Sequence, residues 1–371
     1  MSKKRYKALG LMSGTSLDGV DAAIMDTDGE QIFGFGQTYF RPYSRKEQNV
    51  LGAATQAALK WNFTGTPPNV FGQAEAIIHQ AHIEAAQAII SDAIDLVGFH
   101  GQTVLHRPAA PEQNGQTLQL GDGQVLADAL GVDVVYDFRS ADVQVGGQGA
   151  PLAPIYHQAM LRKSQIGMPA AALNIGGVSN ITLVGAGGEL LASDCGPGNG
   201  PLDSWVQMCG RGSYDKDGAL ALAGVPDFAL IDKWLSREFF AKPVPKSADR
   251  WDFDVLHDLK NQMPENGAAS LVGFTAMAIA HTLRQYDDAA KTIIVCGGGR
   301  KNSAIMAALR EQGIGVIMSA EQAGWRGDDL EAEAFAYLAV RRLRNMPLSY
   351  PKTTGVKKPM SGGIIVTPSS A

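Results

Sequence analysis

Residues 8–26 read ALGLMSGTSLDGVDAAIMD, in which two apolar runs flank the polar turn Ser13–Gly19. Apolar runs on both sides of a Gly- and Ser-rich turn predict a β-hairpin. Glycine permits a close approach to a ligand, and successive backbone N–H groups can bind an anion. Because Asp18 and Asp21 would repel an anion, a cation is expected with it. The hairpin therefore suggests a phosphate site with Mg²⁺, and a plain turn stays open as the alternative.

Composition excludes several classes of protein. The 371 residues are 45% hydrophobic and 19% charged, which predicts a folded protein of two domains. The net charge of −5 and the lack of a basic stripe argue against nucleic acid as a partner. Three cysteines without CxxC spacing fit a reducing compartment, and no apolar run is long enough to cross a membrane. The polar turn also interrupts any signal peptide, so a cytoplasmic protein is expected.

Strand and helix patterns alternate along the chain. Ser44 and Glu47 have capping-box spacing, which predicts a helix towards Trp61, and helical periodicity returns near residues 70–93. Ile94–Phe99 is expected to be a buried strand that ends at His100. Such alternation predicts an α/β fold.

The opening pattern then occurs a second time. Ala170–Ile175 is apolar, Gly176–Asn180 is a Gly-rich turn and Ile181–Val184 is apolar again. Two such hairpins suggest two related halves that face one ligand. We therefore predict an N-terminal domain at 1–166 and a C-terminal domain at 167–371. The latter would include the helix predicted over 328–344 and a tail that is either an ordered extension or a frayed end.

Phosphate binding would need unusual turns, because the sequence lacks both a P-loop and a Rossmann fingerprint. Three Gly-rich turns follow predicted strands, at Gly14–Gly19, Gly176–Asn180 and Gly297–Gly299. Ligands bind at the carboxyl ends of strands in open α/β sheets, so these turns are candidates for a nucleotide site. Each could also be an ordinary tight turn.

Asp194 is the candidate catalytic base. It is expected to end a strand, and the following Gly-Pro-Gly-Asn loop would expose its carboxylate. A carboxylate in a cleft can take a proton from a hydroxyl group or from water. The alternative is an Asx-turn residue.

His100 and Arg139 are the candidates for binding a polar substrate. The His100/His106 spacing is not that of a metal site, so His100 with Gln102 is expected to hydrogen-bond a sugar, unless it is a structural histidine. Arg139 could bind a carboxylate through two hydrogen bonds, unless it forms a surface ion pair.

Several strings closely resemble the anhydro-N-acetylmuramic acid kinases. They are MSGTSLDGVD, HGQT, DFRSADVQVGGQGAPL, LNIGGVSN, DCGPGN, VCGGG with a following Asn, and LEAEAFAYLA, in the family's order from about residue 8 to 355. The resemblance implies the sugar kinase/heat-shock chaperone/actin-like superfamily. That fold has two actin-like (ribonuclease H-like) α/β domains with ATP in the cleft between them.

The resemblance also implies a reaction. Family members use ATP and water to open the 1,6-anhydro bridge of anhydro-N-acetylmuramic acid and phosphorylate O6, in peptidoglycan recycling. Asp194 matches the catalytic aspartate, which deprotonates the attacking water. The implied partners are these small molecules and a second copy of the chain in a homodimer.

Two sets of binding residues follow by position. The implied ATP-binding residues are Gly14, Thr15, Ser16, Leu17, Asp18, Gly19, Val20, Asp21, Gly176, Gly177, Gly297, Gly298, Gly299 and Asn302. The implied substrate-binding residues are His100, Gln102, Arg139, Gln148 and Gly149. Mg²⁺ is expected with the ATP phosphates, and Asp18 is a candidate ligand.

Two other functions stay open at this point. The first is a kinase of the same superfamily that acts on another amino sugar. The second is an ATP-hydrolysing assembly or chaperone-like protein, against which Asp194, His100 and Arg139 argue, because such a protein needs no sugar pocket.

Overall fold

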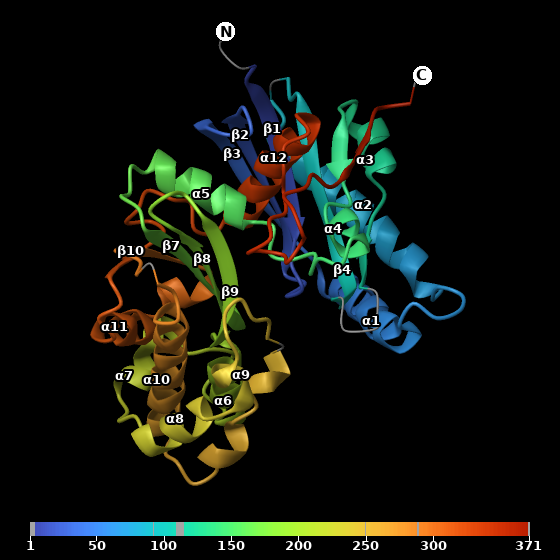
Figure 1. Ribbon diagram of the computed structural model, residues 1–371. Helices are drawn as coiled ribbons and strands as arrows, with labels where there is room; N and C mark the ends of the chain where they lie inside the picture. The colour runs from blue at the N-terminus through green and yellow to red at the C-terminus, as the bar shows by residue number, and fades with distance from the viewer. Residues whose placement is uncertain (1–3, 92, 109–114, 249, 288, 370–371) are drawn as a thin grey trace. The chain divides into compact units, whose positions relative to one another are not determined.

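The computed structural model describes residues 4–91, 93–108, 115–248, 250–287 and 289–369. The chain forms two compact units, coloured along the sequence in Figure 1. Unit 1 consists of residues 1–163 and 328–371, and unit 2 of residues 164–327. The boundary predicted from the sequence lies after residue 166, with the C-terminal segment in the second domain. The structure corrects that assignment, because the chain returns to unit 1 after Gly327.

Unit 1 is built on one mixed sheet. Its elements are β1 (Tyr6–Ser13), β2 (Gly19–Thr27), β3 (Ile32–Pro42), α1 (Arg45–Trp61), α2 (Val70–Ile89), β4 (Leu96–Arg107), β5 (Gln116–Leu120), α3 (Gly123–Leu130), β6 (Val134–Tyr136), α4 (Ser140–Gln144), α5 (Pro154–Lys163), α12 (Leu330–Leu343) and β12 (Ile364–Val366). The strand order is β12-β6-β4-β1-β2-β3, and β5 pairs with β4. Strands β1, β4 and β6 are parallel, whereas β2 is antiparallel to both of its neighbours. The predicted hairpin and the capping box of Ser44 and Glu47 are both confirmed.

Helix α12 packs closely on this sheet because glycines line its path (Figure 1). Leu9 and Leu11 of β1 belong to the core that α1 and α2 cover, so the intervening Gly10 faces the opposite side. A Cβ atom on Gly10 would lie 1.8 Å from the carbonyl oxygen of Ala332, and one on Gly98 would lie 2.2 Å from that of Phe335. These contacts explain why α12 belongs to unit 1.

Unit 2 repeats the topology. Its elements are β7 (Ala170–Ile175), β8 (Val178–Val184), β9 (Leu190–Pro197), α6 (Gly200–Met208), η1 (Lys216–Gly218), α7 (Ala219–Leu222), α8 (Phe228–Leu235), α9 (Glu238–Ala241), η2 (Arg250–Phe253), η3 (Leu256–Leu259), α10 (Pro264–Leu283), β10 (Thr292–Cys296), η4 (Gly298–Lys301), α11 (Ser303–Glu311) and β11 (Val316–Ser319). The order β11-β10-β7-β8-β9 and the strand directions correspond to β6-β4-β1-β2-β3. The two related α/β halves inferred from the repeated hairpin are therefore confirmed.

Two strands run further than predicted. Strand β4 does not end before His100, because it leaves β1 at Gln102 and then pairs with β5 up to Arg107. Strand β9 does not end before Asp194, because its pairing with β8 continues to Pro197 across a bulge. None of the helices in the described residues has both the length and the apolarity of a membrane span.

Candidate functional site

The first predicted phosphate turn, Ser13–Gly19, joins β1 and β2. Thr15, Ser16 and Asp18 are exposed, whereas Val20 is buried in β2 and can offer a ligand only its backbone. The Asp18 carboxylate accepts hydrogen bonds from the Ser16 hydroxyl at 2.6 Å and the Gly19 amide at 3.2 Å. Leu17 has a φ of 56°, a left-handed conformation that the turn imposes. The turn therefore presents hydroxyl groups and one carboxylate to solvent.

Gln102 anchors the start of this turn. Its amide oxygen accepts a hydrogen bond from the Ser13 hydroxyl at 2.5 Å, and its amide nitrogen donates to the Gly14 carbonyl at 3.1 Å. The Tyr43 hydroxyl lies 3.1 Å from the same Ser13 oxygen. Sequence analysis expected Gln102 to contact the sugar. In the structure both ends of this buried amide are hydrogen-bonded to the turn, and the sugar contact stays a prediction.

Acidic side chains gather beside Asp21, which is half-buried in β2. Burial, together with the negative charges of Asp18 and Glu331, raises the pKa of Asp21 to about 7. Asp329 and Asp328, just before α12, act likewise. No group of three or more His, Cys, Asp or Glu side chains in the described residues is arranged to hold a metal by itself.

Arg139 follows β6 and is held by neutral groups. Its Nη1 donates to the Gly149 carbonyl at 2.8 Å, and its Nη2 and Nε lie 3.0 and 3.3 Å from Nε2 of His100. Burial lowers the pKa of Arg139, an effect that the more distant Glu331 and Asp142 oppose. The surface ion pair left open by the sequence is not formed, because no carboxylate lies within 4 Å of Arg139 among the described residues.

Two residues that sequence analysis missed fix the loop containing Gln148 and Gly149. Asp142 accepts hydrogen bonds from the Gly149 amide at 2.7 Å and the Thr354 hydroxyl at 2.6 Å. The Thr354 carbonyl in turn accepts from the Gln148 amide at 2.7 Å. The part of the C-terminal tail around Thr354 is therefore an ordered extension that supports this loop. Asp142 lies inside the quoted DFRSAD string, whereas nothing in the sequence pointed to Thr354.

A small cavity of mixed polar and apolar lining lies in unit 1, and His100 is one of its lining residues. Its volume is about 200 Å³, and its polar lining includes Thr117, Gln119, Asp137 and Ser140. Hydroxyl, amide and carboxylate groups around one cavity suit a polar ligand such as part of a sugar.

In unit 2, the second predicted phosphate turn, Gly176–Asn180, is joined to the start of α6. The Gly177 carbonyl accepts hydrogen bonds from the amides of Gly198 and Gly200 at 3.0 and 3.1 Å, and Asn199 donates to Gly176 at 2.7 Å. A Cβ atom on Gly198 would lie 2.2 Å from the Gly176 oxygen. Glycine is therefore required where these two loops meet.

The Gly297–Gly299 turn packs against the same hairpin. A Cβ atom on Gly297, whose φ is +70°, would lie 2.4 Å from Oδ1 of Asn174. One on Gly299 would lie equally close to the side chain of Ile175. Asn302 caps α11 by accepting from the Ile305 amide at 3.1 Å. Two of the three predicted phosphate turns thus lie together in unit 2.

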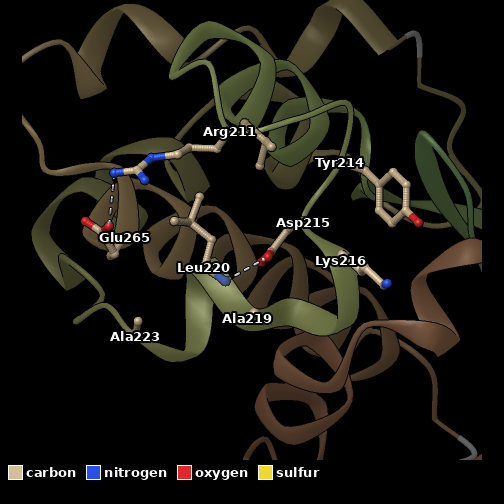
Figure 2. A pocket seen from close by; sticks show the side chains of 9 residues that line it. Arg211, Tyr214, Asp215, Lys216, Ala219, Leu220, Ala223 and Glu265 are labelled. Atoms are coloured by element: carbon tan, nitrogen blue, oxygen red, sulfur yellow. Dashed lines mark hydrogen bonds and ion pairs between the residues drawn. The ribbon is translucent and has the colours of Figure 1, made fainter.

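A cavity of about 350 Å³, drawn in Figure 2, lies next to this region, with Val206, Leu220 and Ala223 among its apolar lining residues. Arg211 and Glu265 pair across it at 3.8 Å (Figure 2). The Asp215 carboxylate accepts from the amides of Leu220 and Ala221 at 2.8 and 3.1 Å, which fixes the turn that follows. That turn reaches Asn302, because a Cβ atom on Gly218 would lie 2.5 Å from its Oδ1. No pattern in the sequence predicts this cavity.

Asp194 lies at the bulge of β9. Asn180 pairs with Asp194 and Ser179 with Gly196, so Cys195 is the extra residue. Bulges redirect side chains and are common beside active sites. One oxygen of Asp194 accepts from the Ala248 amide at 2.8 Å, and the other has no hydrogen-bond partner among the described residues. Burial raises the pKa of Asp194 to about 6, so the group can exchange a proton near neutral pH.

A sequence model of the anhydro-N-acetylmuramic acid kinase family matches residues 6–368. The chain belongs to this family. Among relatives of that name, the chain is 47% identical to the Caulobacter vibrioides protein, with 97% of this chain and 98% of the relative covered. It is 45% identical to the Bradyrhizobium diazoefficiens protein, with 97% and 99% covered.

A solved structure of a protein with another name is also similar to this chain. Component A of (R)-2-hydroxyglutaryl-CoA dehydratase from Acidaminococcus fermentans is 15% identical, with 90% of this chain and 99% of that chain covered. The TM-score is 0.44. Family membership therefore rests on the sequence alone. It establishes that the chain is a kinase, whereas the role of each site residue stays a prediction.

Proposed function

We propose that the protein converts 1,6-anhydro-N-acetylmuramic acid, ATP and water into N-acetylmuramic acid 6-phosphate and ADP, as a step in peptidoglycan recycling. The observation that carries this proposal is the family match over residues 6–368, together with full-length relatives that have this enzyme's name. The geometry of Asp194 and of Arg139 supports the same reaction.

Asp194 is the proposed general base. Its unpartnered carboxylate oxygen takes one proton from a water molecule, whose oxygen forms a bond with the anomeric carbon C1 of the sugar. The bond between C1 and O6 breaks, and its electron pair stays on O6. A pKa raised by burial supports this role, because a base works best when its pKa lies near the operating pH.

The released O6 then attacks the γ-phosphorus of ATP, and the bond to the β-phosphate oxygen breaks to leave ADP. Phosphoryl transfer depends mainly on positioning and on neutralising charge. We assign these tasks to the backbone and hydroxyl groups of Gly14–Ser16 and to the turns at Gly176 and Gly297. The tight packing of the last two turns supports a rigid phosphate site in unit 2.

Arg139 is the proposed partner of the lactyl carboxylate of the sugar. A guanidinium has five N–H groups, of which three are directed to His100 and Gly149, so donors remain for a ligand. A half-buried cation without a paired carboxylate is costly unless an anion binds to it. Arginine is also well suited to two parallel hydrogen bonds with a carboxylate.

Mg²⁺ is proposed to enter with the ATP phosphates. The mutual repulsion of Asp18 and Asp21 fits a cation nearby, because a divalent ion would relieve it. Magnesium is commonly bound by one or two carboxylates together with substrate phosphates, and these two aspartates could supply such ligands. Such an ion supplies charge neutralisation for phosphoryl transfer.

A coupled assay of ADP release tests the proposal. ADP should appear only when 1,6-anhydro-N-acetylmuramic acid is present, and the product should be the 6-phosphate of the opened sugar by mass spectrometry. ADP release that does not respond to this sugar would refute the proposal. The homodimer implied by the resemblance and the cytoplasmic location expected from the sequence stay predictions, which light scattering and cell fractionation can test.

A further inference from the structure

The imidazole of His100 is held in one tautomer. His100 is 4% exposed, and its ring packs against Phe335 of α12 with ring centroids 4.6 Å apart. Its Nδ1 lies 2.7 Å from the Gly101 carbonyl oxygen, which can only accept a hydrogen bond. Nδ1 must therefore have the proton, and Nε2 keeps its lone pair. That lone pair faces the Nη2 and Nε groups of Arg139.

Both ring nitrogens of His100 are thus in use within the protein. The sugar contact expected from the sequence would require one of these two hydrogen bonds to break. Arg139 has the complementary arrangement, because a neutral imidazole and a carbonyl orient its guanidinium without cancelling its charge. A carboxylate in place of His100 would pair with Arg139 and compete with an anionic ligand.

We propose that His100 is a positioning residue: its neutral Nε2 fixes the guanidinium of Arg139 so that the free N–H groups receive the carboxylate of the substrate. His100 acts through Arg139 and forms no hydrogen bond with the sugar. This inference rests on the proposed function, and it concerns selection for the carboxylate rather than the chemical step. It predicts that the two residues behave as one unit.

Substitutions in the full-length protein test this unit. His100→Leu should raise the KM for 1,6-anhydro-N-acetylmuramic acid about 10- to 100-fold, as Arg139→Met should, because each disrupts hydrogen bonds of a charged group. The double variant should be no worse than Arg139→Met alone. His100→Gln, whose amide oxygen can replace Nε2 as acceptor, should restore much of the loss. The KM for ATP should not change.

A substrate comparison separates positioning from direct contact. 1,6-Anhydro-N-acetylglucosamine lacks the lactyl carboxylate, so we expect it to react more slowly than the carboxylate-bearing sugar and His100→Leu to leave that lower rate unchanged. The matched control is His82→Leu, because His82 is also fully buried but faces Phe99 and the Ile78 carbonyl instead of Arg139. It should leave the preference between the two sugars intact. The proposal would be overturned if His100→Leu lowered kcat/KM equally for both sugars and if this loss added to that of Arg139→Met in the double variant.

A measurement without turnover covers variants that fold poorly and keeps this proposal separate from the kinase assignment. Long-range ¹H–¹⁵N spectra of the wild-type protein should show His100 neutral, with the proton on Nδ1. The Nε2 resonance should move in Arg139→Met, because its hydrogen-bond donor is lost. A proton on Nε2, or an unchanged Nε2 resonance, would refute the positioning role even if the enzyme is active. Absence of sugar-dependent ADP release would instead refute the proposed function.

Discussion

The contact between Gly10 and α12 leads to a sharp prediction for Gly10→Ala. The added Cβ would lie 1.8 Å from the Ala332 oxygen and 2.6 Å from the Ala336 nitrogen, where ordinary contact begins near 3.4 Å. Both atoms are backbone atoms, so no side-chain rotation can relieve the clash. The start of α12 must therefore move by about 1.6 Å, the difference between the two distances. Glu331, whose charge acts on both Asp21 and Arg139, moves with it.

We expect two measurable effects of this displacement. Overpacking should cost about 3 kcal/mol, which for a unit of about 200 residues lowers the Tm by roughly 6–12 °C. A shift of more than 1 Å near the site should lower kcat/KM about 100-fold. Differential scanning calorimetry and the ADP-release assay measure these effects.

The matched control is Gly52→Ala in α1. A Cβ atom there would meet nothing within 4 Å, so the substitution should stabilise the helix by about 0.5–1 kcal/mol and leave kcat/KM unchanged. If Gly10→Ala had the Tm and activity of wild type, the close approach of α12 to β1 would be wrong.

Four further predictions follow from the site. Asp194→Asn should lower kcat by about 100- to 10,000-fold and keep ATP binding by calorimetry, and near-normal turnover would exclude Asp194 as the essential base. Because burial raises the pKa of Asp194 from 3.8 to about 6 and a base acts in its ionised form, kcat should rise with pH through about 6; a limb near 4 would contradict this. The side-chain amide of Gln102 holds the Ser13–Gly14 turn, so Gln102→Leu should raise the KM for ATP about 10-fold and leave the KM for the sugar unchanged. A raised KM for the sugar with an unchanged KM for ATP would support the sugar contact expected from the sequence. Because the pKa of Asp21 is raised from 3.8 to about 7, ionisation of this group reduces the stability of the folded protein as the pH rises through that range. Asp21→Asn should therefore increase the Tm at pH 8 while kinase activity falls. An unchanged Tm would show that the repulsion is not significant.

Local sequence signals predicted much of the fold. The hairpins at Ser13 and Gly176 and the cap at Ser44 depend on neighbouring residues, so the sequence contains the information needed to identify them. The two related halves also follow from the repeated hairpin. By contrast, the return of α12 to unit 1 depends on shape, because the grooves over Gly10 and Gly98 become visible only once β1 and β4 lie side by side.

The candidate site was predicted by residue type better than by geometry. Asp194 and Arg139 were identified as candidates, but Asp194 was placed at a strand end, since a bulge such as that at Cys195 leaves no periodic signal. Gln102 and His100 were both expected to bind the sugar. The sequence could not show that their polar atoms are used on Gly14 and Arg139, which are distant along the chain.

The discontinuity of unit 1 also bears on how the chain folds during synthesis. The face of β1 and β4 that contains Gly10 and Gly98 stays uncovered until α12 is made. This helix is translated about 170 residues after Lys163. At about 5–20 residues per second, that interval is roughly 10–30 s. Residues 164–327 emerge meanwhile and can fold first, while an incomplete unit 1 exposes backbone and apolar surface to solvent. The nascent chain should therefore depend on chaperones most strongly just before residue 343 leaves the ribosome.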